Sequence, residues 1–118
     1  MTQSQREAIF DFLLVAMYAD GNIALSENSR LYELISSLGW DSYQNERAYS
    51  QGAISRVRGA VESAEGLDAF LAAISARLAD DETKIMALIL FARLMEVDES
   101  IAATEYDVYS RAKAIFGL

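Results

Sequence analysis

The sequence contains no histidine, no cysteine and no proline among its 118 residues. Without cysteine there is no disulfide framework, no thiolate nucleophile and no cysteine zinc site. Without histidine, Ser-His and Cys-His catalysis and the histidine zinc sites are excluded. Without proline no helix is sharply broken and no proline-rich linker is present. Any metal site must therefore use oxygen ligands, which suit hard ions such as Ca²⁺.

The chain is strongly acidic, because its 18 acidic residues outnumber its 10 basic residues and give a net charge of −8. The basic residues are scattered, whereas nucleic-acid binding requires a basic face that neutralises phosphates. We therefore expect no nucleic-acid partner, and a cation or a basic protein partner fits the charge better.

No apolar stretch is long enough to cross a bilayer. The longest runs, Phe12–Ala19 and Ile85–Ala92, fall far short of the roughly 20 residues that a span requires. We interpret both runs as buried helices and expect no direct membrane insertion. The polar start of the chain is unlike a signal peptide, so a cytoplasmic location is expected.

The composition predicts an all-α protein, since alanine, leucine and glutamate are abundant and no segment alternates like a strand. The pattern of segment 41–49 fits either a short helix or an ordered loop. Trp40, Tyr43 and Tyr49 are expected to cover the edge of the core. Arg56 and Arg58 are expected on a solvated helix face.

The predicted helices cover about 4–19, 27–38, 52–64, 67–78, 81–95 and 105–116.

The chain contains an internal repeat. An offset of 78 residues aligns Asp20 with Asp98, Glu27 with Glu105, and Gly39 with Gly117 without a gap. Each copy predicts a long buried helix, a corner, and a second helix that ends at glycine. We therefore predict a compact single-domain bundle over residues 1–118. Its parts are a first hairpin at about 7–40, an insert at 41–84 and a second hairpin at about 85–118.

The two corners carry the candidate site. Each corner places an aspartate after the buried helix and a glutamate on the first turn of the next helix, which ordinary turn and capping preferences also explain. If the four acids converge, their mutual repulsion either raises the pKa of a carboxyl group or favours a bound cation. An EF-hand loop is excluded, because Ala16 and Tyr18 occupy its first two ligand positions. The candidate metal ligands are Asp20, Glu27, Asp98 and Glu105.

The pair of corners, Ala-Asp-Gly-x5-Glu from Ala19 and Val-Asp-x6-Glu from Val97, resembles the TerB-like tellurite-resistance family. The resemblance spans essentially the whole chain. It implies an all-α fold, an acidic cluster that binds a divalent metal, and a role in the stress response near membrane-associated protein partners. The sequence departs from the family pattern at Glu99, where a glycine is usual, and at Asn28 and Tyr106, where a second acid is common.

Three functions follow as hypotheses. The first is a non-enzymatic, TerB-like stress-response or regulatory domain that binds Ca²⁺ or another hard divalent cation. The second is a metal-free helical module for protein–protein interaction. The third and most distant is a hydrolase that works with carboxylates alone, for which a chain this short offers little room for a cleft. The partner, the ion and the oligomeric state are not determined by the sequence.

Overall fold

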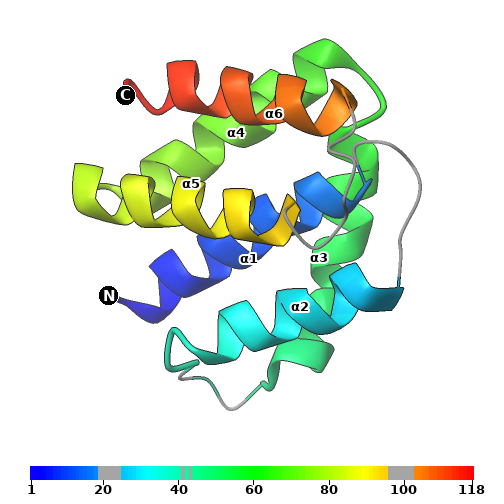
Figure 1. Cartoon of the computed structure of the whole chain (residues 1–118), viewed down its shortest axis with the longest axis vertical. Coiled ribbons are helices and arrows are strands. Elements are labelled where there is room, and N and C mark those ends of the chain that lie inside the picture. The colour runs from blue at the N-terminus through cyan, green and yellow to red at the C-terminus, as the bar shows by residue number, and fades with distance from the viewer. Residues whose placement is uncertain (19–24, 41, 43, 96–102) are drawn as a thin grey trace.

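The computed structural model is an all-α bundle (Figure 1). It describes residues 1–18, 25–40, 42, 44–95 and 103–118, with only the backbone at 25–28 and 103–105. Over these residues there is no strand, and no helix is long and apolar enough to cross a membrane. The helices are α1 (Gln3–Tyr18), α2 (Leu25–Ser36), α3 (Glu46–Ala60), α4 (Ala64–Leu78), α5 (Asp81–Met95) and α6 (Ala103–Ile115).

Helix α1 is the centre of the bundle and packs against each of the other five helices. Every residue from Ala8 to Met17 is buried, as the all-round apolar pattern predicts. Phe12 stacks on Phe91 of α5 with ring centroids 4.7 Å apart. Burial of a large apolar side chain contributes about 1.5–3 kcal/mol, so α1 anchors the core.

The two hairpins have matching helices. Helix α2 begins at Leu25 and α6 at Ala103, which are the positions that the 78-residue offset aligns. Both second helices end before a glycine in the left-handed region, with φ 78° at Gly39 and φ 77° at Gly117. The predicted repeat of helical hairpins is thereby confirmed at the level of helices and their C-terminal ends.

Two helix starts in the insert differ from the prediction. Helix α3 begins at Glu46 because the Asn45 side chain accepts a 2.8 Å hydrogen bond from the backbone N–H of Ala48. Ala64, predicted as the last residue of that helix, is instead the exposed first residue of α4. The Ser63 side chain caps the start of α4 by accepting a hydrogen bond from the N–H of Gly66, whereas α3 already ends at Ala60.

The aromatic residues at the edge of the core lie as predicted where they are described. Trp40 and Tyr49 pack against Phe10 at centroid distances of 5.8 and 5.4 Å. Tyr43 lies outside the described residues.

Helix α5 is only partly buried, so the prediction of a buried helix over Ile85–Ala92 is wrong for one face. Ile85, Met86 and Ile89 are 47%, 39% and 43% exposed. The opposite face of α5 packs on α1 and α4, with α2 and α6 along its sides. An eight-residue apolar run looks the same whether a helix is covered on one face or on all faces, which explains the error.

The turn between α4 and α5 is tight. The N–H of Asp80 donates to the carbonyl of Leu78 at 2.9 Å, and Ala79 between them has φ 71° and ψ −58°. These values describe a γ-turn that is strained for any residue with a Cβ. Asp80 then caps α5, since its carboxylate accepts a 2.7 Å bond from the N–H of Thr83, and this bond lowers the pKa of Asp80.

We predict that Ala79→Gly stabilises the protein by about 1 kcal/mol, because glycine removes the strain of the positive φ. The free energy of unfolding in urea measures the change. The matched control is Ala73→Gly on the exposed side of α4, which should instead cost about 0.5–1 kcal/mol. A loss of stability in both variants would contradict the prediction.

Candidate functional site

The predicted metal ligands cannot be compared directly with the structure. Asp20 and Asp98 lie outside the described residues. Glu27 lies in the first turns of α2 and Glu105 in those of α6, where the side chains are not described. Over the residues with described side chains, no group of three or more acids is arranged to hold a metal ion. The four-carboxylate site therefore stays a prediction.

A buried carboxylate, Asp11, is the main polar feature of the interior. Asp11 lies in the middle of α1 and its side chain is fully buried. One carboxylate oxygen accepts a 2.7 Å bond from Arg77 of α4. The other accepts a 2.8 Å bond from the hydroxyl of Tyr49 on α3 and lies 3.4 Å from Arg56. The cluster therefore ties α1 to both helices of the insert.

The environment of Tyr49 perturbs its ionisation. Burial and the negative charge of Asp11 together raise the pKa of Tyr49 to about 12. Arg56 completes the contact by donating to the Tyr49 hydroxyl at 3.1 Å. The side chain of Arg56 is half-exposed, as predicted, but it also pairs with a buried acid, which the prediction of a purely solvated face did not include.

The sequence carries one signal for this cluster. Asp11 is a lone acid inside an apolar helix segment that runs from Ile9 to Met17. A charge within a helix that is buried all round requires a partner of opposite sign. The partners, Arg56 and Arg77, lie far away in the sequence and could not be named without the fold. Because Asp11 is fully buried, it holds helices together and cannot touch a substrate.

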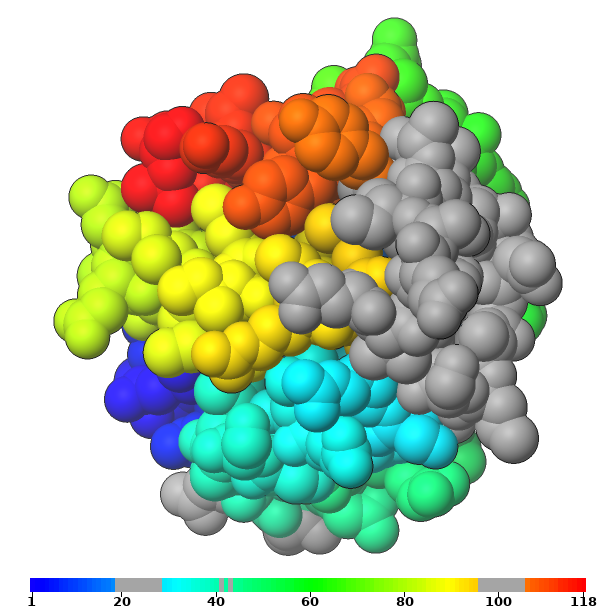
Figure 2. All heavy atoms as spheres, in the orientation of Figure 1, coloured from blue at the N-terminus to red at the C-terminus, as the bar shows by residue number. Residues whose placement is uncertain are grey.

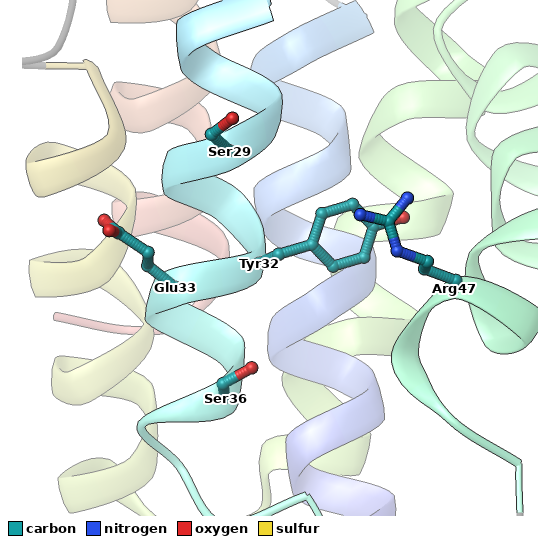
Figure 3. A pocket seen from close by; sticks show the side chains of 5 residues that line it. All are labelled: Ser29, Tyr32, Glu33, Ser36 and Arg47. Carbon is teal, nitrogen blue, oxygen red and sulfur yellow. The ribbon is translucent and has the colours of Figure 1, made fainter.

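An open hollow of about 580 Å³ lies between α2 and α3 (Figure 3). Tyr32 reaches across from α2, and the guanidinium of Arg47 lies 5.0 Å from the centre of its ring. Glu33 pairs with Arg30 at 3.2 Å on the rim. Ser29 and Ser36 add hydroxyl groups.

The lining of the hollow is polar and contains no imidazole group. It carries both signs of charge, from Glu33 and Arg47, together with the hydroxyl groups of the two serines. Ser29 and Ser36 lack an imidazole base, since the chain has no histidine. Ser36 donates a long 3.4 Å bond to the carboxylate of Glu46 at the start of α3.

Comparison of the chain with models of protein families, with curated proteins and with solved structures finds no match. The TerB-like resemblance therefore rests on the two corner motifs and their order in the sequence.

We predict that Asp11→Ala destabilises the protein by about 3 kcal/mol and lowers the melting temperature by about 10 °C. The loss is at the low end for a broken buried pair, because the Arg56 and Arg77 side chains are 49% and 34% exposed and keep contact with water. The control is Asp68→Ala, which breaks an exposed pair with Arg111 and should cost less than about 1 kcal/mol. Equal losses in the two variants would contradict a structural role for Asp11.

The raised pKa of Tyr49 predicts a loss of stability in alkali. In the unfolded chain the phenol ionises near 10.0, and in the folded protein near 12. The stabilisation is therefore complete below pH 10.0 and is lost as the pH rises through about 12. Tyr49→Phe should flatten the decline in unfolding free energy over this interval.

A spectroscopic titration checks the same assignment. In the folded protein, Tyr49→Phe should remove one late-ionising phenol from the tyrosinate absorbance. Tyr106→Phe, which removes a 64% exposed tyrosine, should leave that late step in place. A late step that persists in Tyr49→Phe would contradict the assignment.

Proposed function

We propose that the protein is a non-enzymatic, TerB-like regulatory domain that binds a hard divalent cation at its two repeated corners. Asp20 and Glu27 from the first corner and Asp98 and Glu105 from the second are the proposed ligands. Their chemistry fits the ion, because Ca²⁺ prefers carboxylate and carbonyl oxygens and needs neither histidine nor cysteine.

The observation that carries the proposal is the paired arrangement of the hairpins. Helices α1 and α5 contact each other and run toward the same side of the molecule, and α2 and α6 run back from that side (Figure 1). The described ends that flank the two corners, Tyr18 and Leu25 in one and Met95 and Ala103 in the other, therefore lie toward one side. This arrangement supports a site to which both corners contribute.

A bound ion would change the stability of the domain and its readiness to bind a partner. At the proposed site, two acids from each corner would repel one another without an ion, and the ion would hold the ends of two helical hairpins together. Such a link between an ion and the relative position of two hairpins suits a regulatory domain in the stress response, in contact with a membrane-associated protein partner, as the resemblance implies.

Thermal melts in the presence of Ca²⁺, Mg²⁺, Mn²⁺ or Zn²⁺ test the proposal. At a concentration 100 times Kd, an ion that binds only the folded state stabilises it by about 2.7 kcal/mol, or about 10 °C in melting temperature. The double variant Asp20→Asn, Asp98→Asn should abolish the shift and still fold, because asparagine keeps the turn chemistry.

A matched control removes the same charge elsewhere. Glu62→Gln with Glu65→Gln neutralises two exposed acids near the α3–α4 turn and should leave the shift intact. Melts that no ion changes would contradict cation binding. That result would favour the second candidate, a metal-free interaction module, which the polar hollow of mixed charge between α2 and α3 supports.

A further inference from the structure

The exposed side of α5 carries a stripe that is apolar in the middle and charged at both ends. Glu82, Met86, Ile89 and Arg93 are exposed and follow one another at spacings of four, three and four residues. This spacing places them on one face of the helix, as in the contact seam of a coiled coil. We call these four residues the α5 stripe. Ile85, 47% exposed, borders its apolar centre.

One more exposed apolar side chain, from Met1, lies next to the stripe. Met1, 50% exposed, lines a hollow of about 320 Å³ together with Glu82 and Met86. Single exposed apolar residues are normal on a soluble protein, but contiguous ones mark a contact surface. Figure 2 shows the surface of α5 (yellow-green to yellow) uncovered between α6 (orange to red) and α2 (cyan).

The internal repeat shows what happens to the equivalent face in the first hairpin, where other helices of the same chain cover it. The offset that aligns the two hairpins sets Asp11 of α1 on Ile89 of α5. In α1 this face is covered by α3 and α4, whose Arg56 and Arg77 pair with Asp11. In α5 the corresponding face is apolar, and within the described part of the chain no helix covers it.

We propose that a second copy of this chain covers the face, with the two α5 helices packed antiparallel about a two-fold axis. In that arrangement Glu82 of one copy lies opposite Arg93 of its partner, at both ends of the contact. Met86 lies opposite Ile89 in the middle. The face is thus complementary to itself, which a two-fold contact requires.

Charge selects the direction of the contact. A parallel arrangement sets Glu82 against Glu82 and Arg93 against Arg93, and both pairs repel. Within the described residues neither side chain has an ion pair or hydrogen bond of its own, so both are available. The charges at the two ends of α5 also suit the antiparallel direction, since acids lie in its first turn and Arg93 lies in its last turn.

The size of the face indicates a weak dimer. Helix α5 has 15 residues, or about 22 Å of length, and stable interfaces bury about 1,200–2,000 Å² in total. A contact centred on one helix lies at the lower end of that range. We therefore expect a Kd of about 1–100 µM, with affinity from the apolar centre and direction from the charges.

Sedimentation of the full chain over a range of concentrations tests the dimer, at low salt and with a chelator present. The chelator separates this test from the proposed cation site. Ile89→Asp should leave the protein folded, because Ile89 is 43% exposed, and should abolish the dimer. A wild-type chain that stays monomeric to about ten times the upper Kd, or a dimer that Ile89→Asp leaves intact, would overturn the proposal.

Charge reversal tests the antiparallel register. Glu82→Arg and Arg93→Glu should each weaken the dimer by about tenfold, since each single reversal creates two repulsive pairs. An equimolar mixture of these two variants should dimerise again, and so should the chain that carries both changes. Asp81→Arg is the matched control, because Asp81 is also exposed in the first turn of α5 but lies off the stripe. Single reversals without effect, or a mixture that stays monomeric, would overturn the register.

Discussion

The fold depends on one constraint, which is that α1 is surrounded by other helices on all sides. Ten consecutive residues, Ala8–Met17, are buried, so the remaining helices must wrap around this one. A helix in this position leaves no solvated side for a charge. Asp11 is therefore possible only because Arg77 and Tyr49 reach it from two different helices.

The Asp11 cluster gives the bundle specificity as well as stability. Apolar packing tolerates small rotations of one helix against another, whereas a carboxylate bonded on both oxygens fixes position and rotation together. Arg77 comes from α4, and Tyr49 and Arg56 come from α3. The insert between the repeated hairpins is thus held to the first hairpin by polar contacts at a defined place.

The second hairpin has no equivalent of this arrangement in the described residues, and its surface differs accordingly. Ile89 stands where the repeat has Asp11, and the face around it is exposed and apolar. One duplicated hairpin is thereby covered by the insert of its own chain. The other presents a face that, by our proposal, a second chain covers. A tandem repeat can acquire two different surfaces in this way while both copies keep the same helices.

The sequence by itself determined the helical class, the repeat, the left-handed glycines at Gly39 and Gly117, and the all-round burial of α1, because these follow from local periodicity and capping. The spacing of acids in the sequence also predicts a site made of Asp20, Glu27, Asp98 and Glu105. The structure does not describe these side chains, so this site stays a prediction. Only the tertiary structure decided that Arg56 and Arg77 meet Asp11, and that one face of the apolar α5 segment stays exposed. Both depend on which helices become neighbours, and contacts between residues about 40–70 positions apart leave no periodic pattern in the sequence.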